Sequence, residues 1–267
     1  DNTVCADTNT VNNLDQRGVS RTAATCDIGA FESQGFTLSG ATGSDQRAIV
    51  GEAFAQPLAL TVSSAHTEPV VGGRIVFTAP LSGATMTPTT LTGTVALNGG
   101  VQVTPTAGTL PGDYNVRAGS SGVSGAEIYT LTNDFGPAEH LVVAGYPTTP
   151  VAGESGWFTV TVQDRFSNVV TSYAGSIGFT SSDGLAELPS AYTFTGPDNG
   201  QKAFTATLKT AGSQIITGTD TLSPTVTGAQ RGIQVLPAAP DTISVTSGND
   251  QHAIIGNQFT TPLQALV

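Results

Sequence analysis

The densest group of residues able to do chemistry lies between Asp15 and Glu32, in the stretch DQRGVSRTAATCDIGAFE. The stretch holds two arginines, several carboxylates and a cysteine, in a chain whose residues are only 11% charged. Arginine–carboxylate pairs can bind a substrate, and the same pairs can fasten one piece of backbone to the next. Two interpretations therefore stand at the outset: a catalytic site, or the end-piece of a fold.

The histidines and cysteines offer no further catalytic arrangement. His66, His140 and His252 are far apart in the sequence and fall in none of the metal-binding or catalytic spacings. The two cysteines have no histidines near them, which disfavours a zinc site. We therefore expect solvated loop histidines, no catalytic or cofactor-binding residue, and no enzymatic activity in this chain.

Calcium is the metal that the remaining polar residues would suit best, because it binds oxygen ligands on loops. However, no loop carries regularly spaced aspartates, and Asp and Asn in turns usually serve turn geometry. We predict no metal site and no cofactor, and keep calcium, most plausibly where one unit meets the next, as the alternative. The candidate ligands are Asp164, Asn168, Asp183, Asp198, Asn199 and Asp220.

Trp157 is the one tryptophan of the chain and the residue best suited to contact a ligand. In the run WFTVTV it is out of phase with the inward Phe158, which favours an exposed position or one at the domain edge. An exposed ring can serve as a sugar-binding platform, and Tyr146 and Tyr173 could lie beside it. The alternative, which we favour, is a tryptophan that packs at a joint between domains.

The elements that would position these residues are short strands. β-branched runs broken by Gly, Pro, Asn and Asp continue through the chain, without helical periodicity. Seven such runs per roughly 100 residues are typical of an immunoglobulin-like (Ig-like) β-sandwich. The predicted strands lie at 36–40, 47–51, 58–64, 74–80, 95–100, 114–120 and 127–133 in a first unit, and at 140–145, 157–164, 175–182, 191–196, 202–209, 214–220 and 232–237 in a second.

Tyr114 adds a specific expectation to the first unit. It follows a Pro-Gly-Asp turn in LPGDYNV, just before a late strand. A tyrosine corner occupies this position in Ig-like domains, with its hydroxyl bonded back to the turn. We therefore expect the Tyr114 hydroxyl to donate to the backbone of that turn.

An internal repeat sets the domain boundaries. Residues 43–62 (GSDQRAIVGEAFAQPLALTV) align without gaps on 248–267 (GNDQHAIIGNQFTTPLQALV), and half of the twenty positions are identical. A weaker echo at about half that displacement gives a unit of about 100 residues, the size of a whole domain. We expect a first segment over 1–34, Ig-like sandwiches over 35–133 and 134–237, and the start of a third, incomplete repeat over 238–267.

Charge and hydropathy exclude two classes of partner. The net charge is −11, and the few basic residues are scattered, so nucleic acid and anionic membrane surfaces would not be attracted. No apolar run approaches the roughly 20 residues that cross a bilayer, so we expect no membrane insertion in this fragment. We expect a fragment of a longer protein, because the chain opens without methionine and stops inside a predicted strand.

Both cysteines, Cys5 and Cys26, lie in the first segment. An even count confined to one small segment favours a disulfide in an oxidising compartment, and two buried free thiols are the alternative. Closing a loop of about 20 residues would stabilise the fold by roughly 3 kcal/mol.

Two resemblances extend this picture. VTVQDRFSNVVTSYAGSIGFTSSDGLAELPSAYTFT and AIVGEAFAQPLALTV resemble the bacterial Ig-like (Big) tandem repeats of large secreted and surface proteins, related in style to invasin and intimin stalks. The opening segment, with DQRG, a further arginine and CDIGAFE, is similar to the closing motif of right-handed parallel β-helix proteins of the choice-of-anchor Q type. The second resemblance implies that residues 1–34 are the C-terminal cap of a β-helix.

Such a cap would use nearly every distinctive residue of the opening stretch. The exposed strand edges at the end of a β-helix must be covered, or they recruit other chains. Arginines would pair with acids across the turns, and the expected cap residues are Asp15, Arg17, Arg21, Asp27 and Glu32. The competing active site, of the kind that polysaccharide lyases place on β-helices, needs groove-lining coils that this segment lacks.

The function predicted from these features is a non-catalytic stalk or adhesion segment of a secreted or cell-surface bacterial protein, an adhesin. Its partners would be neighbouring Ig-like repeats of the same chain and an unidentified ligand on a host cell, matrix or polysaccharide surface. The alternative is a set of spacer or carbohydrate-binding modules attached to an extracellular β-helix enzyme that acts on carbohydrates.

Overall fold

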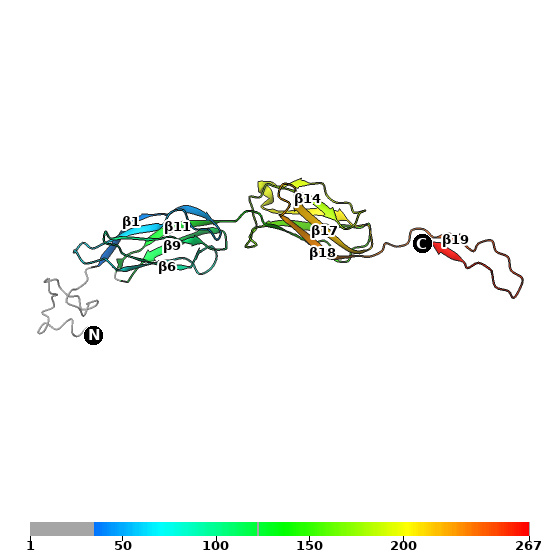
Figure 1. Ribbon diagram of the computed structural model, residues 1–267, viewed down its shortest axis with the longest axis horizontal. Helices are drawn as coiled ribbons and strands as arrows, with labels where there is room; N and C mark the ends of the chain where they lie inside the picture. The colour runs from blue at the N-terminus through cyan, green and yellow to red at the C-terminus, as the bar shows by residue number, and fades with distance from the viewer. Residues whose placement is uncertain (1–34, 122, 267) are drawn as a thin grey trace. The chain divides into compact units, whose positions relative to one another are not determined.

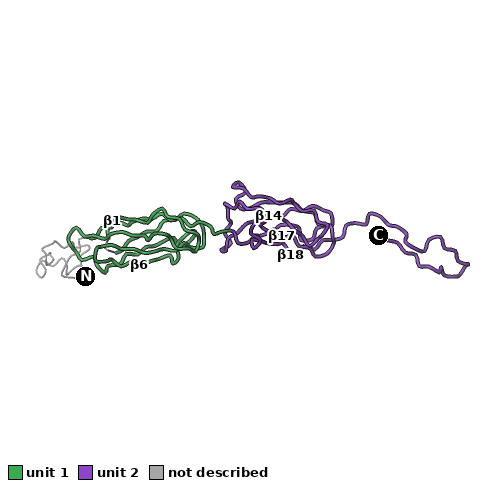
Figure 2. The backbone as a smooth tube through the Cα atoms, turned by 45° about the horizontal axis from the view of Figure 1, so that its top comes forward, with its two compact units in different colours: residues 1–137 green, residues 138–267 purple. Residues whose placement is uncertain are grey.

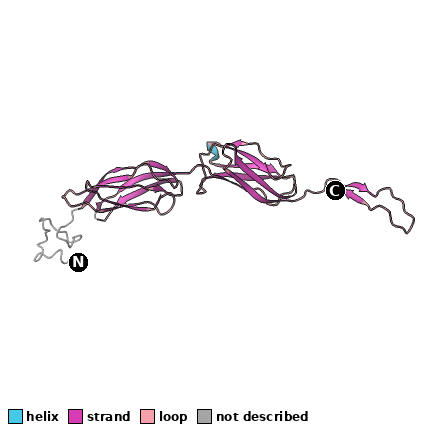
Figure 3. Ribbon diagram, viewed as in Figure 1, coloured by secondary structure: helices cyan, strands magenta, loops and turns pink. Residues whose placement is uncertain are grey.

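A computed structural model describes residues 35–121 and 123–266 (Figure 1). The chain divides into two compact units, residues 1–137 and 138–267 (Figure 2). Over the described ranges both units consist of β-strands and loops, and the 3-10 turn η1 (Gly196–Asp198) is the one helical element (Figure 3). The all-β fold predicted from the sequence is confirmed.

Unit 1 is a two-layer sandwich. One sheet has four strands in the order β10-β1-β3-β7, and the other has five in the order β2-β11-β9-β4-β6. This division of consecutive strands between two sheets is that of an Ig-like sandwich. The strands are β1 (Phe36–Thr42), β2 (Gln46–Ile49), β3 (Leu58–Ser63), β4 (Arg74–Thr78), β5 (Met86–Thr87), β6 (Thr90–Thr94), β7 (Gly100–Val103), β8 (Thr106–Ala107), β9 (Gly112–Gly119), β10 (Val123–Ser124) and β11 (Glu127–Asp134).

The two sheets of unit 1 share one apolar core. Strand β3 buries Leu58, Leu60 and Val62 and turns the residues between them toward the surface. In the other sheet, the rings of Phe77 and Tyr129 meet with their centroids 5.9 Å apart. Each side chain of this size stabilises the fold by roughly 1.5–3 kcal/mol relative to its exposed state.

The prediction of a strand over residues 95–100 is wrong. This segment is a turn, in which the Ala96 N–H donates to the Gly100 carbonyl and the Gly99 N–H donates to the Ala96 carbonyl, both at 2.9 Å. The strand lies just before it, as β6 at the edge of the five-stranded sheet. Its sequence TLTGT has a single large apolar side chain, so alternation does not reveal it, and hydrogen bonding to β4 defines it instead.

The prediction of a tyrosine corner at Tyr114 is also wrong. The Tyr114 side chain is buried, but its hydroxyl has no hydrogen-bond partner among the described residues. The carbonyl of Leu110, in the preceding turn, accepts instead from the side-chain amide of Asn133 (3.0 Å). The tyrosine that binds backbone in unit 1 is Tyr129, whose hydroxyl donates to the Ala59 carbonyl of the facing sheet at 2.9 Å.

We expect the variants Tyr129→Phe and Tyr114→Phe to differ in stability. Loss of the Tyr129 hydroxyl leaves the Ala59 carbonyl without this donor and should lower the free energy of unfolding by about 1 kcal/mol. Loss of the Tyr114 hydroxyl removes a buried polar group that pairs with nothing, so this free energy should rise or stay within about 0.5 kcal/mol of the wild type. Urea denaturation of both variants measures the difference, and equal losses would contradict the assignment.

Unit 2 repeats the two-layer plan. A three-stranded sheet, β12-β13-β16, and a four-stranded sheet, β15-β14-β17-β18, form its layers. The pairs within both sheets are antiparallel. The strands are β12 (His140–Ala144), β13 (Ser155–Gln163), β14 (Ser176–Ser181), β15 (Tyr192–Thr193), β16 (Gln201–Thr207), β17 (Gly212–Asp220) and β18 (Thr227–Val235).

The core of unit 2 contains a cluster of aromatic rings among its aliphatic side chains. The alternation predicted for β13 is confirmed, since Phe158, Val160 and Val162 are all buried. Across the sandwich, Phe179 of β14 meets Phe158 and Phe204 with ring centroids 5.6 and 4.8 Å apart. Aromatic pairs at such separations add roughly 0.5–1.5 kcal/mol beyond their buried area.

In both units, early residues pair in parallel with the last strand. In unit 1, β2 pairs with β11, matching residues 46–49 to residues 131–134. In unit 2, the Leu236 N–H just after β18 donates to the Pro150 carbonyl (2.7 Å), and the Ala152 N–H donates to the Leu236 carbonyl (2.8 Å). In each sandwich a segment that follows the first strand is thus hydrogen-bonded directly to the end of the chain's last strand in that unit.

The hairpin of β19 (Ser244–Ser247) and β20 (Gln264–Leu266) repeats the strand register that opens unit 1. It pairs Ser244 with Leu266, and β1 and β3 pair Ser39 with Thr61, the equivalent residues 205 positions earlier. The irregularity that follows this pair in β1 has its counterpart in β19. The sequence repeat is therefore also a repeat of local structure.

One glutamine closes the loop that precedes β3 in unit 1, and its equivalent closes the loop that precedes β20. The Gln46 side chain donates to the Gln56 carbonyl (3.0 Å) and accepts from the Gln56 N–H (2.7 Å). Gln251 makes the same two bonds to Thr261, at 2.7 and 2.8 Å. A primary amide presents a donor and an acceptor side by side, so it can pair with a backbone residue as a strand neighbour would.

Candidate functional site

Trp157 lies on the outward face of the β12-β13-β16 sheet and is 69% exposed. Its neighbours Gly156 and Phe158 are buried on the opposite face. Gly156 leaves room there for the ring of Tyr146, since a Cβ at this position would approach Tyr146 Cε2 to 2.7 Å. Packing of the inner face thus determines which residue of β13 presents its ring to solvent.

The two tyrosines considered as companions of Trp157 do not lie beside it on the surface. Tyr146 is 2% exposed, and its hydroxyl donates to the Ala206 carbonyl at 3.3 Å. Tyr173 packs edge-on against Phe194, and its hydroxyl donates to the Asp220 carboxylate. Burial raises the pKa of both phenols, as expected for hydroxyls that serve the interior.

Hydroxyl side chains border Trp157 instead. In the antiparallel ladder Trp157 lies opposite Thr205, and Ser155 lies opposite Thr207. These residues share the outward face because side chains alternate along a strand. Each hydroxyl offers one donor and two acceptor lone pairs, so the surface beside the ring can both donate and accept hydrogen bonds.

A cleft of about 290 Å³ opens beside this row of hydroxyls. Two of its lining residues form a backbone bridge, in which the Glu187 N–H donates to the Thr207 carbonyl (2.8 Å) and the Thr207 N–H donates to the Glu187 carbonyl (2.9 Å). Trp157 is not one of the lining residues, but its partner in the ladder, Thr205, is, so the ring lies next to a cleft that main-chain pairing holds in place. The lining residues are Ser155, Glu187, Leu188, Pro189, Thr205, Ala206 and Thr207.

Asp183 joins the turn before Glu187 to the residues just after Thr207. It is 4% exposed, and its carboxylate accepts from the backbone N–H groups of Leu185 (3.0 Å), Lys209 (2.6 Å) and Thr210 (2.9 Å) and from the Thr210 hydroxyl (2.6 Å). Burial raises the pKa of this carboxyl, but the hydrogen bonds outweigh it and hold the pKa at about 2. The Lys209 ammonium in turn forms an ion pair with Glu187 at the cleft.

The other turn residues weighed as calcium ligands also bond to the protein itself. The Asp164 carboxylate accepts from the backbone of Phe166 and Asn168, and Asp220 accepts from the backbone of Leu222 and Ser223. Asp198 accepts from Thr195 and Lys202, and the Asn199 side chain donates to the Pro197 carbonyl. Over the described residues, no group of three or more His, Cys, Asp or Glu side chains could hold a metal ion.

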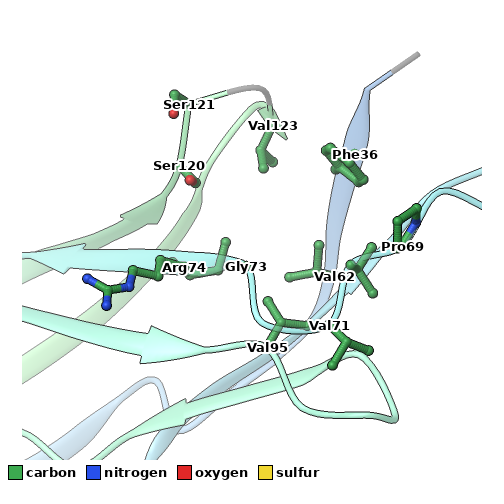
Figure 4. A pocket seen from close by; sticks show the side chains of 12 residues that line it. Phe36, Val62, Pro69, Val71, Gly73, Arg74, Val95, Ser120, Ser121 and Val123 are labelled. Carbon is green, nitrogen blue, oxygen red and sulfur yellow. The ribbon is translucent and has the colours of Figure 1, made fainter. Parts of the chain in front are cut away.

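Unit 1 carries a small apolar notch at the end where β1 begins (Figure 4). The notch has a volume of about 140 Å³, and Phe36, Val62 and Val123 face it, whereas the Arg74 side chain points away. A second hollow in unit 1, of about 470 Å³, is lined by threonines, backbone and the side chains of Asn98 and Gln102. Neither hollow contains an acid, a histidine or a cysteine in its lining.

The histidines, the cysteines and the predicted cap residues are not part of the surface around Trp157 or lie outside the described residues. His66 and His252 are exposed, and the His140 ring lies 3.1 Å from the Gln163 side chain across β12 and β13. The predicted Cys5–Cys26 disulfide stays a prediction, because both cysteines lie outside the described residues. The same holds for the predicted cap residues Asp15, Arg17, Arg21, Asp27 and Glu32.

The sequence predicts the outward position of Trp157 but gives no sign of the cleft beside it. Glu187 lies in a loop, GLAELPS, without strand-like alternation, and its pairing with Thr207 is a single isolated bridge. No local signal marks such a bridge, because its partner is 20 residues away along the chain. Asp183 carried the signal of a turn, in SSDG, but not that of its bonds to Thr210.

Comparison with known proteins adds similar structures but no family. No protein-family model matches the chain, and no curated protein matches it. Similar solved structures include the Escherichia coli adhesin FdeC (19% identity, 79% of this chain and 67% of that chain, TM-score 0.41) and invasin, a bacterial integrin-binding protein (18%, 79% and 42%, TM-score 0.35). A β-glycosidase from Bacteroides vulgatus is also similar (12%, 83% and 27%, TM-score 0.35).

The chain thus spans less than half of invasin and less than a third of the glycosidase. In the part of the chain that the structure describes, no helix is long and apolar enough to cross a membrane.

Proposed function

We propose that this chain is a non-catalytic spacer and adhesion segment, built from tandem Ig-like units, of a bacterial secreted or cell-surface protein. The observation that carries the proposal is the structural repeat, since residues 244–266 reproduce the strand register and the glutamine-closed loop of unit 1. A tandem series of similar sandwiches extends a protein without adding chemistry. The role requires no cofactor and no catalytic residue.

The repeat also implies a further sandwich. Ile255, Phe259 and Leu263 are 102%, 61% and 80% exposed, whereas the equivalent residues of unit 1, Val50, Phe54 and Leu58, are at most 2% exposed. Apolar side chains of this size stabilise a fold only when a facing sheet covers them. We propose that residues 238–267 open a third unit, completed by strands like β4, β9 and β11.

The parallel pairing at the ends of each unit suits a segment that bears load. Tension on a sandwich pulls its first and last strands in opposite directions. Once β1 has been pulled straight, the load in unit 1 falls on β2 and the last strand, β11, which run parallel and side by side, so it acts along their ladder and several hydrogen bonds must break together. Leu236 and its partners place a shorter pair of the same kind in unit 2.

Single-molecule force spectroscopy on the intact chain tests this role. We expect two separate unfolding events, each releasing roughly 300 Å of chain, because an extended residue spans at most about 3.6 Å and each unit holds roughly 100 residues. Arg47→Pro, which places a proline within β2, should weaken or remove one event and leave the other unchanged. One merged event, or unfolding without measurable resistance in the wild-type chain, would refute the spacer role.

A further inference from the structure

The surface around Trp157 has features that a spacer does not need. Several large apolar side chains of the two described sandwiches are exposed, and Trp157 is the one aromatic residue among them. A single exposed apolar side chain is common on a protein surface, but this indole lies next to a cleft with a polar lining, and the two together form a surface that can hold a ligand. The ring, the hydroxyls of Ser155, Thr205 and Thr207, and the Glu187 carboxylate all face the same side of the sheet.

We propose that Trp157 and the adjoining cleft bind a neutral, extended oligosaccharide. A pyranose ring has a flat face of C–H groups that packs on an aromatic ring, and a rim of hydroxyls that need hydrogen-bond partners. Trp157 supplies the first, and the three side-chain hydroxyls with Glu187 supply the second. This inference is independent of the spacer role, because a spacer can carry a sugar site or lack one.

The charge of the site selects against acidic sugars. Glu187 is 68% exposed, and the nearby cation, Lys209, is already paired with it. The carboxylate of a uronate would therefore be repelled by Glu187, and Lys209 would have to leave Glu187 in order to pair with it. The net charge of −11 adds to this repulsion. Neutral β-1,4-linked glucose or xylose chains avoid this repulsion and present a flat face at successive rings.

A proline-rich peptide is a less suitable occupant. Grooves that bind such peptides stack several aromatic rings along the ligand. Here Trp157 is the single ring, and the cleft beside it is lined mainly by hydroxyls and backbone. Sugars, with one hydroxyl on most carbons, match that lining better than the few polar atoms of a proline helix.

The intrinsic fluorescence of the intact chain tests the proposal directly, because Trp157 is its one tryptophan. We expect cellohexaose or xylohexaose to produce a saturable change in emission, and hexagalacturonate to bind at least about 10-fold more weakly. A proline-rich decapeptide should produce none. Emission that stays unchanged with both neutral sugars, or that responds to the peptide alone, overturns the proposal.

Variants that keep the tryptophan locate the site. Thr205→Val and Glu187→Gln should each weaken binding of the neutral hexaose by about 10-fold, as expected for one lost hydrogen bond. Thr180→Val is the matched control, because Thr180 is an exposed strand threonine on the other sheet of unit 2, and its affinity should equal that of the wild type. Circular dichroism confirms that each variant is folded. Unchanged affinity in both cleft variants would show that the sugar binds elsewhere.

Discussion

Replacement of Gly228 by alanine should lower the free energy of unfolding of unit 2 by about 2–3 kcal/mol. Gly228 lies in β18, where a Cβ would fall 1.9 Å from the carbonyl oxygen of Leu141 in β12. That neighbour is backbone and cannot rotate away, so the two sheets of unit 2 would have to separate locally. The added Cβ alone forces this movement, because the backbone conformation at residue 228 is one that alanine adopts without strain.

Gly178→Ala is the matched control for this prediction. Gly178 lies in β14 of the same sheet, and the nearest atom to its Cβ would be Thr221 Cγ2 at 3.6 Å, an ordinary contact. Alanine is favoured over glycine in a strand by roughly 0.5–1 kcal/mol, so this variant should be neutral or slightly stabilised. Urea denaturation measures both variants, and hydrogen exchange in peptides from β12 and β18 assigns the loss to unit 2. Equal stability of the two variants would contradict the close approach.

Asp183→Ala should destabilise unit 2 by about 3 kcal/mol at neutral pH. The change leaves four donors, including the backbone N–H groups of Lys209 and Thr210, without their acceptor in a buried place. Asp241→Ala is the control, because Asp241 is exposed and lies outside the strands. A loss in Asp183→Ala no larger than in Asp241→Ala would show that the carboxylate does not hold the turn.

The same carboxylate makes stability depend on pH in the acid range. In the folded state the hydrogen bonds hold the pKa of Asp183 at about 2, below its value of about 3.8 in the unfolded chain. A lowered pKa means that its stabilising contribution is complete above pH 4 and is lost as the pH falls from 4 to 2. Wild type should therefore lose on the order of 1–2 kcal/mol more than Asp183→Ala over this interval. Denaturation of both proteins at pH 5, 3 and 2 provides the comparison, and parallel curves would contradict the assignment.

The parts of the fold that follow from local pattern were predictable from the sequence. Phe158, Val160 and Val162 alternate with threonines, and the structure buries the three apolar residues. The outward position of Trp157 follows from the same alternation. A period of two residues is enough to separate the two faces of a strand, so no tertiary information is needed.

The parts that depend on distant partners were not predictable. Tyr114 has the local sequence of a tyrosine corner, but Asn133, on the neighbouring strand β11, binds the carbonyl that the corner would use. Strand β6 has almost no apolar pattern and is defined by its ladder with β4. The cleft beside Trp157 depends in the same way on the bridge from Glu187 to Thr207. In each case the competing interaction joins segments that only the folded chain brings together.

The pairing of β2 with β11 has a consequence for the order in which a unit matures. Synthesis and translocation deliver a polypeptide from its N-terminus, so residues 46–49 emerge long before residues 131–134, their partners in the ladder. Until the closing strand arrives, the five-stranded sheet lacks one of its members, and the high sequence separation of the contact delays its completion. The ladder between β2 and β11 can therefore form only after residues 131–134 have emerged, so unit 1 completes its five-stranded sheet with its last strand.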